Sequence, residues 1–402
     1  MRIAFLVPDD RDEFRRYADA EPYFGPAPSA LLEGLAKMPE CEVHIVCAIQ
    51  KALRSPAKLA DNIYYHSVLV RKWGWMRGAY LGCILALRNK LREIKPDLVH
   101  GQGTERYCAL AAVFSGYPNV LTLHGNMRQL ARMGRARPFS FPWLAARLER
   151  LVLPRSCGVF CNSQHTRRLV SGLAARTWLV PNALRGIFFS APATNRPSLP
   201  PVLLNIGVIS PNKSQNEVLD MAARLRQRQA AFELHFIGNL DEGLAYGRRF
   251  RARINQAEKE GYARYLGQKS EGEMIELMDS ASGLIHTPAE EAFGLVVGEG
   301  LARNLKFFGA RVGGVADIAA GSEGAELFAP GDGPALEEAI FQWLCAGHPK
   351  PKEAARQMRE RYDPGLIARR HLEIYREVLQ LTQSRAGSVS SRERRTRNGG
   401  NG

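Results

Sequence analysis

The sequence is poor in cysteine and lacks long apolar stretches. Its 402 residues include seven cysteines, an odd number, with no Cys-x-x-Cys pair. This argues against a disulfide framework or a structural zinc site and favours a reducing compartment. No stretch reaches the roughly 18 uninterrupted apolar residues of a membrane-spanning helix, and the apolar run at residues 1–8 does not have the form of a signal peptide. We therefore expect a cytoplasmic protein.

Motifs of several enzyme classes are also missing. There is no G-x-x-x-x-G-K-[ST] phosphate loop, and no cluster of His, Cys or Asp has zinc-ligand spacing. Asp10-Arg-Asp12 matches a metal-binding D-x-D pattern, but it follows the first expected strand within a charged loop, which favours a solvated acidic turn. Ser163-Gln-His165 does not lie in a nucleophile elbow. We expect no metal site and no bound cofactor.

Acidic residues are scarce in one part of the chain. Residues 51–200 contain 23 Lys and Arg against 5 Asp and Glu, a balance of +18, whereas residues 201–402 contain 27 against 26, a balance of +1. The total net charge of +15 therefore originates in the first half. Such a one-sided positive field suggests an anionic partner there, which would be membrane headgroups, a phosphorylated substrate or nucleic acid.

Short apolar, β-branched runs alternate with amphipathic stretches of helical length, the pattern of parallel strand–helix–strand units. The expected strands are residues 2–7, 42–47, 97–100, 120–124, 158–162, 202–207, 233–238, 283–287 and 306–310. A proline-rich segment separates the two groups of strands. The sequence thus predicts an α/β protein with two doubly wound, Rossmann-like parallel sheets. The expected parts are a domain at 1–182, a linker at 183–201, a domain at 202–347, helices at 348–383 that pack back on the first domain, and a disordered basic tail at 384–402.

Local signals mark three helix starts. Ser214 with Glu217, and Ser270 with Glu273, each fit a capping box, in which two side chains satisfy free amides at a helix N-terminus. Asp363 is followed by Pro364, and proline is favoured at the first helical position. We expect helices to begin at all three places.

The most informative segment is His286-Thr-Pro-Ala-Glu-Glu-Ala-Phe-Gly-Leu-Val-Val-Gly-Glu299, which leads from an expected strand into an apolar helix. If the interval is mostly helical, the carboxylates of Glu291 and Glu299 lie at most about 12 Å apart, which suits different parts of one long ligand. Amides at a helix N-terminus favour a phosphate, and ionised carboxylates accept hydrogen bonds from vicinal hydroxyls. A nucleotide-sugar has both kinds of group.

This segment and other ordered motifs resemble the C-terminal domain of retaining glycosyltransferases of family 4. The motifs are Glu291-Ala-Phe-Gly-Leu with Glu299, an E-x7-E pattern, followed by Val312-Gly-Gly-Val-Ala-Asp317 and Leu327-Phe-Ala-Pro-Gly-Asp332, and preceded by matching segments at 204–213, 236–238 and 265–267. E-x7-E alone is a weak signal, whereas the ordered set over about residues 201–345 is specific. The resemblance implies the GT-B fold, in which two Rossmann-like domains face an interdomain cleft.

The resemblance also implies which residues form the site. The implied donor-binding residues are Gly25, Gly207, Lys213, Phe293, Gly294, Leu295 and Glu299. Glu299 would bind the ribose hydroxyls and Glu291 the donor sugar, while Lys213 would neutralise the diphosphate as the glycosidic bond breaks, in place of a metal ion. His124, near the end of an expected strand, would contact the donor sugar or its phosphate. Lys213, Glu291 and His124 are the implied catalytic residues, and for each the alternative is an ordinary structural or solvated side chain.

The sequence departs from the family pattern at several places. Val208 stands where the family usually has an arginine that shares the diphosphate with the lysine. Residues 302–306 differ from the usual A-x-G-x-P, Asp317 replaces a common glutamate, and the loop around Gly25 lacks paired glycines. Because Val208 removes a cation, a second hypothesis is a catalytically silent GT-B protein that acts as a binding or partner module.

Two basic stretches remain outside these motifs. One is residues 71–77, Arg-Lys-Trp-Gly-Trp-Met-Arg, and the other contains the arginines at 128, 132, 135 and 137, which precede Phe139, Phe141 and Trp143. Cations interleaved with aromatic residues suit an anionic bilayer surface, whereas the alternative is a solvated face over core aromatics. Stacking on nucleic-acid bases has little support because no nucleic-acid module is recognisable.

We therefore predict a retaining glycosyltransferase that transfers a sugar from a nucleotide-diphospho-sugar donor. The expected acceptor is an envelope glycan or a lipid-linked acceptor at the cytoplasmic membrane face, in polysaccharide or lipopolysaccharide biosynthesis. An anionic membrane surface is a further expected partner, and nucleic acid is not.

Overall fold

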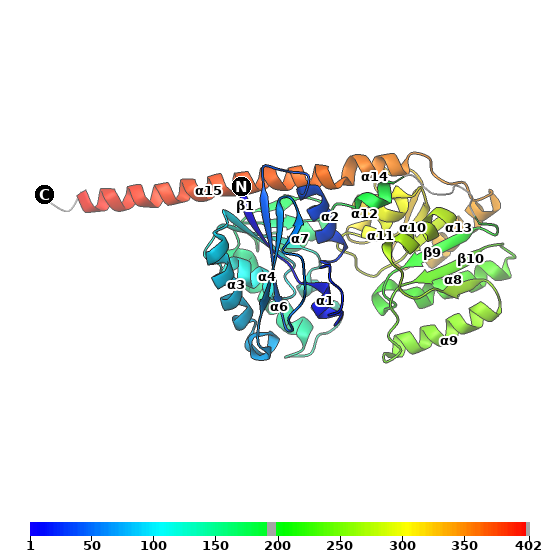
Figure 1. Ribbon diagram of the computed structural model, residues 1–402. Coiled ribbons are helices and arrows are strands. Elements are labelled where there is room, and N and C mark those ends of the chain that lie inside the picture. The colour runs from blue at the N-terminus through cyan, green and yellow to red at the C-terminus, as the bar shows by residue number, and fades with distance from the viewer. Residues whose placement is uncertain (191–197, 399–402) are drawn as a thin grey trace. The chain divides into compact units, whose positions relative to one another are not determined.

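Buried β-branched and aromatic residues form two separate sheets, each covered by helices on both faces (Figure 1). The computed structural model describes residues 1–190 and 198–398. Contacts divide the chain into two units, which we describe separately. Unit 1 consists of residues 1–183 and the chain from Pro364 on, and unit 2 consists of residues 184–363.

Unit 1 contains an eight-stranded sheet. Its strands are β1 (Arg2–Leu6), β2 (Glu42–Ile49), β3 (Lys58–Ala60), β4 (Ile63–Leu69), β5 (Leu98–Gln102), β6 (Asn119–Leu123), β7 (Val159–Cys161) and β8 (Thr177–Leu179). They lie in the order β3-β4-β2-β1-β5-β6-β7-β8, and every pair is parallel except β3 with β4. Phe5 in the central strand β1 lies opposite Ile45 of β2 and His100 of β5.

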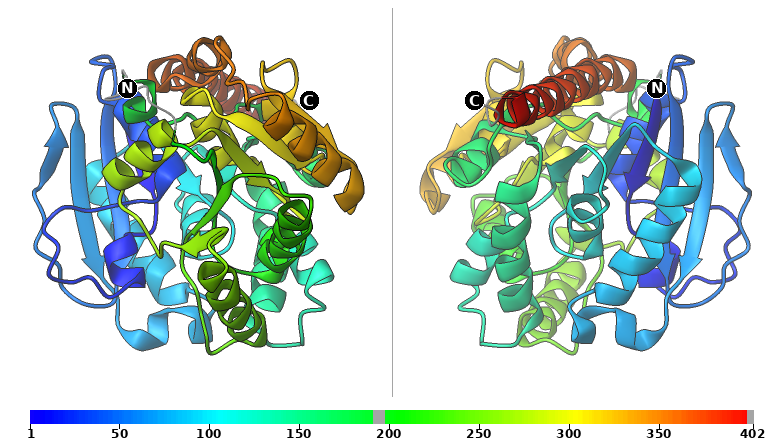
Figure 2. Two further views of the ribbon diagram at one scale, coloured as in Figure 1. Left: turned by 90° about the vertical axis from the view of Figure 1, so that its right-hand side faces the viewer. Right: turned by 90° about the vertical axis from the view of Figure 1, so that its left-hand side faces the viewer.

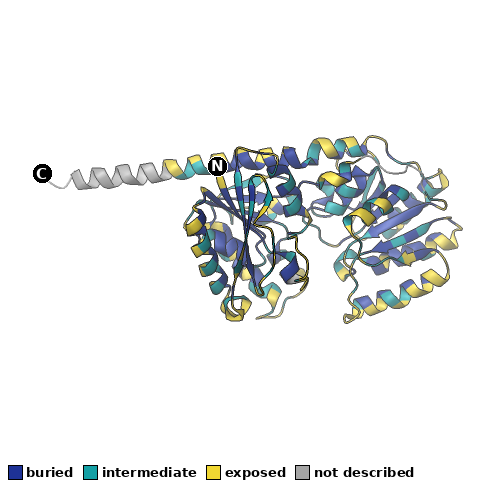
Figure 3. Ribbon diagram, in the orientation of Figure 1, coloured by how far each residue is buried: buried dark blue, intermediate teal, exposed yellow. Residues whose placement is uncertain are grey.

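Alternate residues of β1 enter different cores. Ile3 and Phe5 pack with α2 and α15, whereas Ala4 and Leu6 pack with α3, α4 and α6. The strands are therefore buried on both faces, as parallel sheets usually are (Figure 3). The helices of unit 1 are α1 (Asp10–Glu13), α2 (Pro26–Leu35), α3 (Leu81–Ile94), α4 (Tyr107–Val113), α5 (Met127–Met133), α6 (Phe141–Val152), α7 (Gln164–Val170) and α15 (Pro364–Asn398), with 3-10 turns η1 (Lys72–Gly74), η2 (Met76–Gly78) and η3 (Leu153–Arg155).

The C-terminal helix α15 supplies part of the core of unit 1. It packs against α2, and Ile367, Leu372 and Tyr375 belong to the same buried cluster as Phe5. Gly34 of α2 permits this close packing, because a Cβ there would overlap the main-chain oxygen of the first residue of α15. Figure 2 shows α15 in two further views.

Unit 2 contains a six-stranded, wholly parallel sheet in the order β11-β10-β9-β12-β13-β14. Its strands are β9 (Val202–Ile206), β10 (Glu233–Ile237), β11 (Ala263–Tyr265), β12 (Gly283–His286), β13 (Lys306–Ala310) and β14 (Ala325–Phe328). Leu203 and Ile285 face α8, α9 and α13, while Leu204 and Leu284 face α10, α11, α12 and α14. The helices of unit 2 are α8 (Gln215–Gln227), α9 (Ala245–Lys259), α10 (Glu271–Ser280), α11 (Leu295–Ala302), α12 (Val315–Ala319), α13 (Gly333–Cys345) and α14 (Ala354–Tyr362), with 3-10 turns η4 (Gly186–Phe189) and η5 (Pro211–Lys213).

Three segments differ from the prediction. The start of the expected linker belongs to unit 2, because Leu184 and Phe188 are buried in its core; residues 191–197 lie outside the described residues. Helix α14, expected to pack on the first domain, packs instead against α11 of unit 2. The expected disordered tail is helical as far as Asn398, because extending an existing helix costs less than starting one; residues 399–402 are not described.

The helix-start signals have mixed outcomes. The capping box of Ser270 and Glu273 is formed as predicted at the start of α10. At α8 the helix begins after Ser214 as predicted, but the expected capping box is not formed, because Ser214 has a left-handed φ of 57° and its side chain accepts no capping hydrogen bond. None of the helices in the described part of the chain has both the length and the apolar character needed to cross a bilayer.

Candidate active site

The strand order of unit 2 reverses between β9 and β12. In a doubly wound sheet, the connections that follow two such strands run to opposite faces and leave room for a ligand at the carboxyl ends. Here the connections are residues 207–214, between β9 and α8, and residues 287–294, between β12 and α11. Most of the predicted donor-binding residues of unit 2 lie in these two loops.

Asn212 fastens the two loops together. Its side-chain amide donates to the main-chain oxygen of Glu290, and its side-chain oxygen accepts from the main-chain N–H of Glu290, each at 3.0 Å. The N–H of Ala289 donates to the main-chain oxygen of Asn212 at 2.7 Å. Three hydrogen bonds thus fix the positions of the residues next to Lys213 and Glu291. Asn212 belongs to none of the roles predicted from the sequence motifs.

Lys213 and Glu291 form an ion pair, and Nε2 of His286 lies 3.2 Å from the same carboxylate oxygen of Glu291. Burial alone would raise the pKa of Glu291, but the hydrogen bond with His286 and the charge of Lys213 outweigh it, and the pKa is lowered to about 2. Burial lowers the pKa of His286, although its hydrogen bond to Glu291 acts in the opposite direction. The site therefore holds an ionised Glu291, and the stem of Lys213 lies beside Gly207.

A tight turn after β13 supports the Glu291 loop. The N–H of Gly314 donates to the main-chain oxygen of Glu291 at 2.9 Å. Gly313 has a φ of 47°, and a Cβ at this position would overlap the same oxygen. The Val312-Gly-Gly motif is thus explained by a close main-chain approach that only glycine permits.

Helix α11 begins directly after the Glu291 loop. Gly294 precedes it with a φ of 97°. The amides of Leu295 and Val296 have no acceptor within the helix because no earlier turn exists, and with the helix dipole they favour an anion. The side chain of Phe293 is buried in the core of unit 2, with its ring centroid 5.8 Å from that of Tyr362. Phe293 is therefore available to a ligand only through its main chain.

Glu299 lies on α11 and is partly buried. Burial and the negative charge of Glu271 raise the pKa of Glu299 to about 7, although the charge of Arg185 lowers it. Arg185 itself pairs with Glu271 at 2.7 Å between Nη1 and Oε1. Glu299 consequently changes its charge near neutral pH, and the ionised form is the one that accepts hydrogen bonds from two hydroxyl groups.

Val208 occupies the position where the family usually has arginine, and its side chain is 58% exposed. Its main-chain oxygen accepts from Nε2 of Gln215, and Oε1 of Gln215 accepts from the N–H of Ser210, each at 3.1 Å. Gln215 is fully buried. The loop after β9 is therefore held by a buried amide, a role that no sequence motif predicted.

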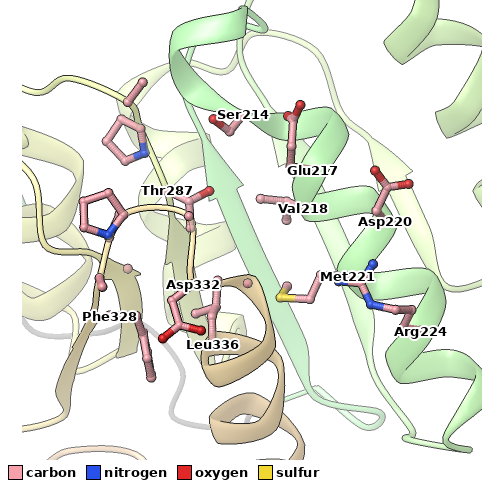
Figure 4. A pocket seen from close by; sticks show the side chains of 18 residues that line it. Ser214, Glu217, Val218, Asp220, Met221, Arg224, Thr287, Phe328, Asp332 and Leu336 are labelled. Carbon is pink, nitrogen blue, oxygen red and sulfur yellow. The ribbon is translucent and has the colours of Figure 1, made fainter.

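A separate cavity of about 520 Å³ borders the same loops (Figure 4). Its walls come from α8, from the segment after β12, from the ends of β13 and β14 and from the start of α13, and neither Lys213 nor Glu291 lines it. Its charged lining side chains are those of Glu217, Asp220, Arg224 and Asp332. Three carboxylates against one guanidinium disfavour an anionic diphosphate, so this cavity is not the candidate donor site.

In unit 1, His124 directly follows β6. Its Nε2 lies 2.8 Å from Oε1 of Gln102, the last residue of β5. Burial lowers the pKa of His124 to about 4, so the imidazole is neutral at physiological pH. A neutral histidine adds no charge at a phosphate, but its two ring nitrogens still donate one hydrogen bond and accept another.

Gln102 links His124 to the interior of unit 1. Its Nε2 lies 3.1 Å from Nε2 of His100, and Nδ1 of His100 lies 2.6 Å from Oη of Tyr375 in α15. Burial lowers the pKa of His100 well below its ordinary value. A hydrogen-bonded chain thus connects the C-terminal helix to the candidate catalytic histidine. No local pattern could have predicted it, because His100 and Tyr375 are 275 residues apart.

The connection from β1 to α2 contains Gly25 and the D-x-D triplet. Gly25 precedes α2 with a φ of 78°. The triplet is not the solvated turn that we expected, because Arg11 and Asp12 are both buried. Asp9, outside the triplet, pairs with Arg11 at 2.7 Å and permits its burial. Across the described residues, no group of three or more His, Cys, Asp or Glu side chains is arranged to hold a metal ion.

Two doubly wound α/β units in succession are the architecture of GT-B glycosyltransferases, and solved structures of this class resemble the chain over nearly its whole length. Sucrose-phosphate synthase from Thermosynechococcus elongatus has a TM-score of 0.74 at 15% identity, covering 95% of this chain and 100% of that one. HepE of Anabaena in complex with UDP-glucose has a TM-score of 0.67 at 17% identity, covering 94% and 100%. The lipopolysaccharide outer core galactosyltransferase WaaB in its apo form has a TM-score of 0.64 at 15% identity, covering 94% and 100%.

Family models agree with the architecture. The model described as Glycosyltransferase Family 4 matches residues 29–184, and the model described as Glycosyl transferases group 1 matches residues 188–361. No curated protein matches the sequence. The chain belongs to glycosyltransferase family 4, and it is therefore an enzyme of glycosyl transfer.

Proposed function

We propose that this protein transfers a sugar from a nucleotide-diphospho-sugar, with retention of anomeric configuration and without a metal ion. The observation that carries the proposal is the ion pair of Lys213 and Glu291 beside the N-terminus of α11. Solved structures of similar fold support the donor class: HepE has been solved with UDP and with UDP-glucose, and an E. coli protein with bound UDP-2-fluoro glucose.

Each part of the candidate site has a task in this proposal. Lys213 and the amides of Leu295 and Val296 bind the diphosphate, whose negative charge grows as the glycosidic bond breaks. Lys213 then shares its charge between the diphosphate and Glu291, and Glu291 accepts hydrogen bonds from the sugar hydroxyls. Ionised Glu299 accepts hydrogen bonds from the ribose hydroxyls.

For the acceptor, we propose an envelope glycan or a lipid-linked molecule at the cytoplasmic membrane face, bound by unit 1. The support is the balance of +18 in residues 51–200, which attracts anionic surfaces. His124 would form neutral hydrogen bonds to the donor sugar or its phosphate, since the pKa of His124 is lowered to about 4 by burial.

Two substitutions that each remove one lysine charge test the donor site. Lys213→Ala should weaken binding of UDP-sugars about 10- to 100-fold, because a charge-assisted hydrogen bond in a partly buried site contributes roughly 1.5–3 kcal/mol. Lys259→Ala removes the same charge from an exposed position on α9 of the same unit and should change affinity less than about twofold. Isothermal titration calorimetry with a panel of nucleotide-sugars measures both variants. Equal effects of the two substitutions would contradict the assignment of the site.

The alternative from the sequence, a catalytically silent binding module, follows from the exposed valine at position 208, whereas membership of the family favours an enzyme. It predicts that the wild-type protein binds a nucleotide-sugar or a partner but neither transfers nor hydrolyses any donor. Release of the nucleoside diphosphate from one common donor, abolished by Lys213→Ala, would exclude it. The distinction needs only a coupled assay of nucleotide release.

A further inference from the structure

A groove of about 640 Å³ lies between α5 and α6 of unit 1. Five of its ten lining residues are arginines, and none is acidic. The arginines are Arg128 and Arg132 of α5, Arg147 and Arg150 of α6, and Arg155 of the turn η3. Within residues 1–190 and 198–398, none of these five guanidinium groups forms an ion pair with a carboxylate. The positive charges of five arginines around one groove repel one another unless an anion lies among them.

The two walls of the groove are joined from the inside. Glu149 of α6 is fully buried, and its carboxylate accepts the N–H of Met127 at 2.9 Å and the N–H of Arg128 at 3.4 Å at the start of α5. It also accepts the hydroxyl of Thr104 at 2.8 Å. Because one buried side chain binds both elements, the arginines project from a preorganised frame, which lowers the entropic cost of binding a ligand.

Aromatic and apolar side chains surround the cations. The guanidinium of Arg147 lies over the ring of Trp143, 4.4 Å from its centroid, and the ring of Phe139 lies 5.3 Å from that of Trp143. Phe139 is 89% exposed, and Leu130 and Met133 of α5 are exposed as well. Exposed aromatic and aliphatic residues beside cations fit the boundary between lipid headgroups and acyl chains.

We propose that this groove binds the phosphate or diphosphate group of a lipid-linked acceptor. The inference rests on the proposed function and adds to it that the acceptor carries a phosphate. The planar guanidinium group of an arginine donates two parallel hydrogen bonds to two phosphate oxygens, and the apolar residues at the rim contact the lipid. Helix α5 begins three residues after His124, so the groove adjoins the segment that follows β6 at the carboxyl end of the sheet.

The experiment measures binding of the full chain to vesicles of phosphatidylcholine with phosphatidic acid, and to vesicles of phosphatidylcholine alone. Arg147→Gln/Arg150→Gln removes two charges from the groove. Arg135→Gln/Arg137→Gln removes two exposed charges from the connection between α5 and α6 that do not line it. We expect the groove variant to bind the phosphatidic acid vesicles at least about tenfold more weakly than wild type, and the control variant to differ less than about threefold.

Inorganic diphosphate distinguishes the sources of the phosphate. Competition by millimolar diphosphate for wild type, but not for the groove variant, supports the phosphate site. If the two double variants lose vesicle binding equally, the phosphate site is overturned, because a diffuse positive field then explains the binding. Binding of free diphosphate with no gain on vesicles would overturn the lipid assignment, and equally tight binding of an oligonucleotide, sensitive to the groove variant, would overturn the acceptor class.

A parallel titration with UDP separates this inference from the proposed function. The groove variant should retain UDP binding, whereas Lys213→Ala should lose UDP binding and retain vesicle binding. If wild type binds no nucleotide while the groove still discriminates between vesicles, the proposed function fails alone. If nucleotide binding is normal and the groove variant binds vesicles like wild type, the groove inference fails alone.

Discussion

Glu299 is predicted to destabilise the ligand-free protein at neutral and alkaline pH. Burial and the charge of Glu271 raise the pKa of Glu299 to about 7, whereas a glutamate in an unfolded chain titrates near about 4.3. As the pH rises between these two values, the unfolded chain releases a proton that the folded chain retains, so the free energy of unfolding falls. The full effect is at most roughly 3–4 kcal/mol at 1.36 kcal/mol per pKa unit.

Glu299→Gln removes this titration. We expect the variant to be more stable than wild type by about 2–3 kcal/mol at pH 8.5, because water still reaches the partly exposed carboxylate and reduces the full effect. At about pH 4 both proteins carry a neutral side chain and should unfold alike. Urea unfolding followed at several pH values gives the difference, provided that the slope of free energy against urea is unchanged.

The matched control is Glu276→Gln, an exposed glutamate on α10 of the same unit. Its effect should stay within about 0.5 kcal/mol at every pH. A Glu299→Gln protein that is less stable than wild type at pH 8.5, or whose difference in stability from wild type does not vary with pH, would contradict the raised pKa of Glu299. The same variant should bind the donor more weakly, since a neutral amide is a poorer acceptor for two ribose hydroxyls; stability and binding would then change in opposite directions.

Two further predictions concern the glycine turn and the buried histidines. Gly313→Ala should lower the thermal midpoint several degrees more than Gly321→Ala and should weaken donor binding. Both glycines have positive φ, which costs alanine roughly 1–2 kcal/mol, but only a Cβ at Gly313 would overlap the main chain of Glu291. Similar decreases of the thermal midpoint in the two variants would contradict the proposed support of the Glu291 loop. Burial lowers the pKa of His371 to about 4, although a hydrogen bond to the main chain acts in the opposite direction. A histidine in an unfolded chain titrates near about 6.5. Unit 1 should therefore lose stability as the pH falls from about 6.5 toward 4. His371→Phe should reduce this loss in urea unfolding, and a wild-type protein that keeps its full stability down to pH 4.5 would disprove the prediction.

The central strands were predictable because they are buried on both faces and appear as continuous apolar runs. Residues 306–310, for example, were expected as a strand and form β13. The missed strands lie near sheet edges or are short. β4 has a burial pattern that alternates toward solvent, and β8 and β11 have three residues each. Such strands are too short or too exposed to appear as a long buried run, and their pairing depends on neighbours distant in sequence.

The ordered motifs of unit 2 predicted which loops carry the site, but not how those loops are held. Lys213 and Glu291, assigned from the motifs, are brought together as an ion pair. Asn212 and Gln215 could not be identified, because an amide side chain that binds main-chain groups has no characteristic pattern of neighbours. Phe293 was assigned to the donor site from its place in the motif, but the motif does not reveal that its side chain faces the core.

The two parts of unit 1 are separated in the chain by all of unit 2, and this has a consequence for synthesis on the ribosome. Residues 364–402 leave the ribosome only after the 180 residues from 184 to 363, which takes about 10–40 s at 5–20 residues per second. During this interval the nascent first part lacks α15, so the apolar face of α2 has no cover and His100 lacks its tyrosine partner. Unit 2, a single continuous stretch, can complete its core first. The preceding sheet of unit 1 has all eight strands by then but is still uncovered where α15 will pack, and this is the species for which a chaperone would compete.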